Sequence, residues 1–155
     1  MTRHELGFDD LDGLDGDVTV DRFGPSTHRS IDDILVPVAG GPNTDAVLGL
    51  AGNLASSWDA SITLLTVVPE DADTGRKRTA ENRLEDYADT LDGIRVETRI
   101  ETGDDVVAIV TALTERFELV VIGDSERSLF QRFFGSSIPD RLGRNTRAPI
   151  FVISR

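Results

Sequence analysis

The sequence predicts an α/β protein with a five-stranded parallel sheet and helices on both faces. Apolar, β-branched segments alternate along the chain with segments whose apolar residues recur every three or four positions, which is the pattern of alternating strands and helices. Two of the apolar segments, 61–68 and 119–122, are almost continuous, as in strands that are covered on both faces. With 155 residues the chain is long enough for one domain with a substantial core.

The first half of the chain predicts two strands and the helix between them. The strand at 31–38 ends at a glycine- and proline-rich turn, and a helix should begin near Asn43, a good N-cap residue. Its buried stripe should consist of residues spaced by three and four: Val47, Leu50, Ala51, Leu54, Ala55 and Trp58. The second strand follows at 61–68.

The second half predicts the remaining elements. A helix at 76–91 is followed by a segment at 94–100 that alternates between apolar and polar residues, as an edge strand does. Asp104 and Asp105 should begin the next helix, where negative charge favours the helix dipole. The last elements are a strand at 119–122, a helix at 138–145 and a closing strand at 149–153.

The apolarity of the strands predicts their order. The segments at 31–38, 62–68 and 119–122 should be interior and 94–100 should be an edge, which right-handed crossovers satisfy in the order 3-2-1-4-5. This order puts the first and fourth strands side by side. Ligands of such sheets bind beyond the carboxyl ends of the strands, at the point where the order reverses. The loops after residues 38 and 122 should therefore share one crevice.

Residues 1–29 differ in composition from the domain expected at 30–155. Acidic residues and glycines dominate this segment, and its few apolar residues cannot offset the cost of ordering the chain. We therefore expect an acidic, mostly disordered tail, with a short strand at 18–20 as the alternative. Both histidines, His4 and His28, fall in this tail and are expected to be solvated.

The composition restricts the function classes. There are 28 acidic and 16 basic residues, and the net charge of −12 repels nucleic acid, so we expect no nucleic-acid partner. Lys77 is the single lysine, which suggests a high-salt cytoplasm such as that of a halophilic archaeon; an acidic protein from an arginine-biased genome is the alternative. The chain has no cysteine, no apolar run near the ~20 residues of a membrane span and no leader, so a cytoplasmic location is expected.

The segment from Gly123 to Ser137 is the most informative loop. Gly123 lets the backbone turn directly after a strand, and Gly135, Ser136 and Ser137 precede a helix whose first amides lack internal partners. Ser137 also has the capping-box spacing to Asp140. The helix start could seat an anion, or it could be an ordinary helix cap. Two features weaken an anion seat: the missing amide of Pro139, and the negative charges of Asp124, Glu126 and Asp140.

No catalytic constellation is visible. Residues 30–155 contain neither histidine nor cysteine, so the serines have no evident base and no metal-ligand cluster is apparent. We therefore expect a protein that is not an enzyme.

Five segments, in order, resemble the universal stress protein family. They are ILVPV at 34–38, LLTVVP at 64–69, VVIG at 120–123, FGSSIPDR at 134–141 and APIFVI at 148–153. The resemblance implies a Rossmann-like fold of the adenine nucleotide alpha hydrolase type, and a crevice for ATP, AMP or another adenine nucleotide.

The family's nucleotide motif is incomplete in this chain. Nucleotide-binding members have Gly, two residues, Gly, nine residues, then Gly-Ser or Gly-Thr. Here Gly123 and the Gly135-Ser136 pair match, Glu126 replaces the middle glycine, and the last spacer has eight residues. The place of an aspartate near the adenosine is taken by Ala39. The expected cofactor-binding residues are Pro37, Val38 and Ala39 after the first strand, Val67 beside the adenine, Ile122 and Gly123 beneath the phosphates, and Gly135, Ser136 and Ser137 at the helix start.

The expected function is a regulatory module whose degenerate crevice binds ATP or AMP weakly or not at all. One alternative is a competent ATP-binding stress protein. The other is an interaction subunit of an amino-acid transporter, because PVAGG at 37–41 and FGSSIP at 134–139 resemble the universal-stress domains found with archaeal amino-acid transporters. The family also associates through its last strand. We therefore expect a homodimer in which two strands at 149–153 pair antiparallel across a two-fold axis.

Overall fold

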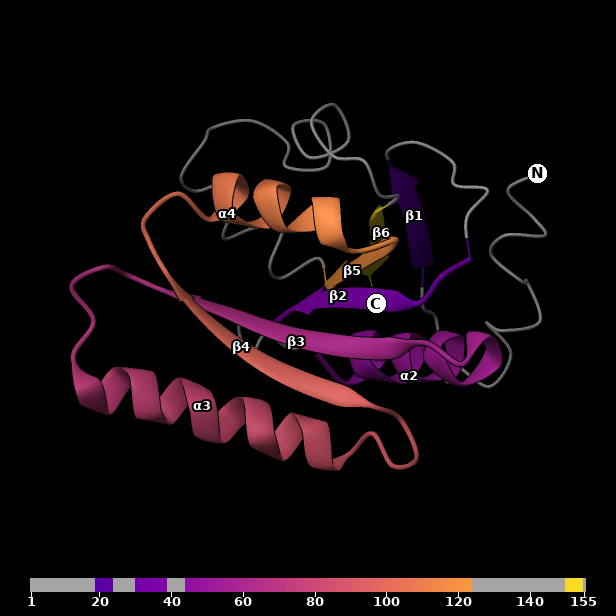
Figure 1. The fold of residues 1–155 in the computed structure, drawn as a ribbon, viewed down its shortest axis with the longest axis horizontal. Helices are drawn as coiled ribbons and strands as arrows, with labels where there is room; N and C mark the ends of the chain where they lie inside the picture. The colour runs from indigo at the N-terminus through magenta and orange to yellow at the C-terminus, as the bar shows by residue number, and fades with distance from the viewer. Residues whose placement is uncertain (1–18, 24–29, 39–43, 124–149, 155) are drawn as a thin grey trace.

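The computed structural model describes residues 19–23, 30–38, 44–123 and 150–154. These residues form a six-stranded sheet in the order β1-β6-β5-β2-β3-β4. The helices α2 and α3 lie on one side of the sheet and α4 lies on the other (Figure 1). The elements are β1 Thr19–Phe23, β2 Asp33–Pro37, α2 Thr44–Trp58, β3 Ser61–Val68, α3 Thr74–Asp89, β4 Val96–Thr102, α4 Val106–Leu113 with a 3₁₀ turn at Thr114–Arg116, β5 Leu119–Gly123 and β6 Ile150–Ser154.

The α/β class and the parallel sheet are confirmed. The first four expected strands lie in the predicted order, because β2 pairs in parallel with β3 and with β5, and β3 pairs in parallel with β4. The alternating segment is the edge strand β4, as predicted. The closing strand β6 pairs in parallel with β5. The expected helix at 138–145 lies outside the described residues.

The prediction of five strands is wrong, because the described residues form a sheet of six. The additional strand is β1, which falls in the segment that we expected to be disordered, near the alternative strand at 18–20. It pairs antiparallel with β6. Its sequence, TVDRF, is rich in β-branched and aromatic residues, which favour strands. The averaged composition of residues 1–29 hides this five-residue segment between acidic and glycine-rich neighbours.

The predicted dimer contact requires an open outer edge at β6. In the structure β5 pairs with one side of β6 and β1 pairs with the other. A second copy therefore cannot add to β6 while β1 is in place. The prediction of a homodimer through strand 149–153 does not fit this conformation.

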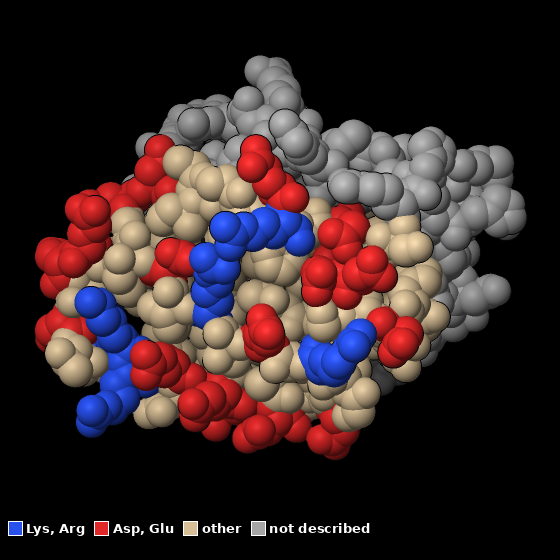
Figure 2. All heavy atoms as spheres, in the orientation of Figure 1, with Lys and Arg blue, Asp and Glu red and all other residues tan. Residues whose placement is uncertain are grey.

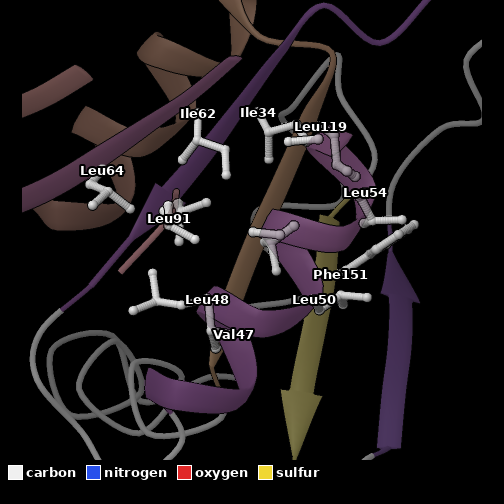
Figure 3. Packing of buried hydrophobic residues seen from close by; sticks show 14 of the residues in the cluster. Ile34, Val47, Leu48, Leu50, Leu54, Ile62, Leu64, Leu91, Leu119 and Phe151 are labelled. Atoms are coloured by element: carbon white, nitrogen blue, oxygen red, sulfur yellow. The ribbon is translucent and has the colours of Figure 1, made fainter. Parts of the chain in front are cut away.

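The main core lies between α2 and one face of the sheet. The predicted stripe of α2 is buried at Val47, Leu50 and Leu54, whereas Trp58 at the helix end is half-buried. Leu50 and Leu54 belong to one cluster with Phe151 of β6, and all three lie close together in Figure 3. This cluster joins strands from both halves of the sheet, because it also contains side chains of β2, β3 and β5.

The described surface carries acidic and basic groups side by side. Figure 2 shows acidic side chains over much of one face, with the basic groups set among them. The net charge of −12 makes the surface repel polyanions on balance. None of the helices in the described ranges combines the length and apolarity that a membrane span requires.

The stability of the α2 core can be tested with Leu54→Ala. Leu54 is 0% exposed, so we expect a loss of about 2–5 kcal/mol in unfolding free energy, measured by chemical denaturation at one fixed KCl concentration. Ser56→Ala is the matched control, because Ser56 is exposed on the same helix and its replacement should change stability by less than about 0.5 kcal/mol. Equal effects of the two substitutions would contradict the core assignment.

Candidate functional site

The carboxyl ends of β2 and β5 lie next to each other. The two strands are in register at Ile34↔Leu119 and Leu35↔Val120, and both then run in the same direction to their ends at Pro37 and Gly123. After β2 the chain continues to β3, which lies on one side of β2. Strand β5 lies on the other side of β2. The order of the sheet therefore reverses between these two ends, which is where ligands of such sheets bind.

Pro37 ends the hydrogen-bond ladder between β2 and β5. The amide of Val38 donates to the carbonyl of Leu65, so the backbone groups of Val38 point toward β3. Successive residues of a strand point these groups to opposite sides, and the backbone of Pro37 therefore faces β5. The hydrogen bond from Glu118 N to Asp33 O agrees with this alternation. A proline has no N–H to donate, and the pairing of β2 with β5 accordingly ends at Leu35↔Val120, whereas β2 stays paired with β3 up to Pro37↔Leu65. The carboxyl ends of β2 and β5 are therefore less tightly hydrogen-bonded to each other than the start of this pair of strands.

Thr66 fixes the point where the chain leaves β2. Its hydroxyl donates to the carbonyl of Val38 at 2.9 Å, and Val38 N donates to Leu65 O at 2.8 Å. Thr66 is 8% exposed and Val38 is 4% exposed, so this pair of bonds is shielded from water. The sequence analysis did not assign Thr66 to the site. A hydroxyl near the carboxyl end of a mostly apolar strand is the signal that could have identified it; the other hydroxyls of β3, those of Ser61 and Thr63, lie nearer its start.

The described site residues lie at the carboxyl ends of β2, β3 and β5. Ile122 and Gly123 are buried at the end of β5, and Val67 is half-buried at the end of β3. The structure thus places five of the expected residues on three adjacent strands at one end of the sheet: Pro37, Val38, Val67, Ile122 and Gly123. The other four, Ala39, Gly135, Ser136 and Ser137, lie outside the described residues, so their part in the site stays a prediction.

Exposed carboxylates lie in the loops that follow the carboxyl ends of β3 and β4. The loop after β3 exposes Glu70, Asp71 and Asp73, and the loop after β4 exposes Asp104 and Asp105. The two loops are joined by a long contact of 3.5 Å from the Glu70 amide to the Asp104 carboxylate. The sequence analysis did not bring these loops together, because the two segments are far apart in the chain.

Two of these carboxylates have structural roles. Asp73 caps α3 by accepting from Arg76 N at 2.8 Å, and Asp105 accepts from Ala108 N at 3.1 Å at the start of α4. The expected placement of Asp105 at a helix start is confirmed. Capping does not remove the negative charge of these carboxylates. The loops after β3 and β4 therefore repel a polyphosphate unless cations screen the charge.

The profile of the universal stress protein family matches residues 30–154. Among solved structures, a universal stress protein from Archaeoglobus fulgidus in complex with dAMP has 16% identity and a TM-score of 0.64, and the match covers 81% of this chain and 99% of that chain. UspA from Lactobacillus plantarum has 20% identity, a TM-score of 0.60, and coverage of 81% and 99%. A universal stress protein in complex with cAMP has 19% identity, a TM-score of 0.59, and coverage of 80% and 97%. At these identities the likeness shows the fold. Among curated proteins, none is significantly similar to this chain.

Thr66→Val tests the bond that holds the end of β2. The substitution keeps the shape of the side chain but removes the donor to the buried Val38 carbonyl, so we expect a loss of about 1–3 kcal/mol in unfolding free energy. Thr98→Val on the exposed part of β4 is the control and should change stability little. A Thr66→Val protein as stable as the control would show that the hydroxyl does not hold this end of the strand.

Proposed function

Because this chain belongs to the universal stress protein family, whose profile spans residues 30–154, we propose that it is a cytoplasmic regulatory module that binds an adenine nucleotide weakly and without turnover. The observation that carries the proposal is the adjacency of the β2 and β5 ends, where the order of the sheet reverses. Two of the structurally similar proteins are complexes, one with cAMP and one with dAMP. An adenine nucleotide such as AMP or ATP is therefore the ligand class that we propose.

The floor of the crevice has the character that a nucleotide requires. Val67 offers a half-buried apolar side chain and backbone groups at the end of β3, which suit a flat base. Gly123 has no Cβ, so a phosphate can approach the backbone closely at the end of β5. Val38 is held rigidly by its two bonds to β3, which reduces the cost of ordering this side of the crevice on binding.

Three chemical features argue for weak binding. Glu126 occupies the position of the family's middle glycine, and Ala39 replaces the aspartate near the adenosine. A carboxylate about 4 Å from a phosphate oxygen costs ~1 kcal/mol in bulk water and ~4 kcal/mol near a protein surface. These costs correspond to roughly a fivefold to a thousandfold loss of affinity. The exposed carboxylates of the loops after β3 and β4, such as Glu70 and Asp104, add to the repulsion.

Binding without turnover agrees with the side chains that the domain contains. Residues 30–155 have no histidine and no cysteine, so a hydroxyl in the crevice has neither an imidazole base nor a thiol beside it. We propose that the bound nucleotide changes the shape or the associations of the domain and is released unchanged.

Calorimetric titration with AMP and ATP in molar KCl tests the degenerate crevice. For the natural chain we expect dissociation constants in the millimolar range. The double variant Glu126→Gly/Ala39→Asp removes the repulsive side chain and restores the missing contact, so we expect at least a tenfold gain in affinity, or about 1.4 kcal/mol. Asp92→Gly is the control, because it removes one exposed carboxylate in the turn before β4 and should leave the affinity unchanged.

The two other outcomes lead to different conclusions. Micromolar affinity in the natural chain would show a competent ATP-binding protein and would refute the weak-binding claim. The absence of any heat in both the natural chain and the double variant would refute nucleotide binding at this crevice.

A further inference from the structure

Strand β6 is paired along its whole length on its outer side. All five of its residues are in register with β1, from Thr19↔Ser154 to Phe23↔Ile150. On the inner side β6 is in register with β5 from Val120↔Ile150 to Gly123↔Ile153. Figure 3 shows β1 and β6 as neighbouring arrows at one end of the sheet. Strand β1 therefore takes the outer position that would otherwise be the open edge.

Without β1, the outer edge of β6 would be able to pair with another strand. The segment Ile150–Ser154 has the sequence IFVIS, and its side chains Phe151 and Ile153 are 2% and 0% exposed in the main core. An apolar edge strand with unpaired N–H and C=O groups is a template for pairing with a second chain. Strand β1 is a poorer template, because its TVDRF sequence places the charged residues Asp21 and Arg22 at its centre.

Strand β1 has the direction that β6 of a second copy would have. Two copies of β6 related by a two-fold axis would have to pair antiparallel, because the axis reverses the strand direction. Strand β1 also runs antiparallel to β6. The chain thus fills, with its own residues, the position that β6 of a second copy would occupy.

Strand β1 is attached to the sheet through a single ladder. Only β6 pairs with β1 among the described strands, so β1 is held along one side, over five residues. An element held by a single short ladder at the edge of a sheet opens at a lower free-energy cost than the interior strands, which are paired on both sides. Loss of β1 would break a single ladder at the rim of the sheet and would leave the four parallel pairings in place.

We propose that β1 is a removable internal cap that keeps the chain monomeric, and that its release opens β6 for antiparallel pairing with a second copy of this chain. The proposal does not depend on nucleotide binding, because β6 lies on the far side of β5 from the crevice seam. The homodimer expected from the sequence would then form only when β1 is displaced from β6.

Val20→Pro/Asp21→Pro in the full-length chain tests the cap. Successive residues of a strand direct their N–H groups to opposite sides, so one of the two prolines must remove a hydrogen bond to β6. Light scattering of the natural chain at high KCl should give the monomer mass, and the variant should give twice that mass. The control Leu11→Pro/Asp12→Pro adds the same two prolines before β1 and should remain monomeric. A dimeric natural chain, or a folded monomeric Val20→Pro/Asp21→Pro variant, would overturn the proposal.

A disulfide tests the placement of β1 if the proline variant does not fold. The sequence has no cysteine, so Asp21→Cys/Val152→Cys introduces the one possible pair, at positions that face each other in the register. Paired antiparallel residues lie within disulfide distance. Oxidation should give a bridge within one chain and a protein that stays monomeric. A bridge between two chains, or no bridge, would overturn the cap. Asp12→Cys/Val152→Cys is the control, and it should form the intrachain bridge more slowly.

Discussion

The double pairing of β2, with β3 on one side and β5 on the other, is the constraint on which the rest of the structure depends. It fixes the reversal of strand order, brings the carboxyl ends of β2 and β5 together, and leaves α2 to cover one face while α4 covers the other (Figure 1). Pro37 then limits the β2–β5 ladder to its first half, and Thr66 ties the exit of β2 to β3 instead.

The parts of the fold that could be predicted are those set by burial. Continuous apolar segments predicted the interior strands, because a strand that is buried on both faces is apolar throughout. The alternating segment predicted the edge strand, because a strand with one buried face alternates between apolar and polar residues. Strand β1 could not be predicted with the same method, since its pairing depends on β6, which lies more than a hundred residues later. The hydroxyl of Thr66 and the rim formed by Glu70 and Asp104 likewise depend on contacts between distant segments.

The position of the candidate site in the sheet could be predicted from the sequence, whereas most of its contacts with a ligand could not. Val38, Val67 and Gly123 occupy the ends of three adjacent strands because strand order determines which ends meet. The contacts expected from Ala39 and from 135–137 fall outside the described residues, and so does most of the resemblance to transporter-associated domains. In this sheet the proposed ligand end and the proposed association edge are different places: one is at the tips of β2, β3 and β5, and the other is along the side of β6. A nucleotide and a second copy could therefore bind to the same domain without competing for the same residues.

The most direct test of the central claim is residue-resolved: the amide chemical shifts of the full-length chain during titration with AMP at constant high KCl. If the ends of β2, β3 and β5 form one ligand-binding floor, the amides of Val38, Val67 and Gly123 will shift together along one saturation curve. The exposed turn at Asp92 and Gly93, at the opposite end of β4, will stay unchanged. Shifts spread over that turn or over α3, with the three strand-end amides unmoved, would show that the nucleotide does not recognise this end of the sheet.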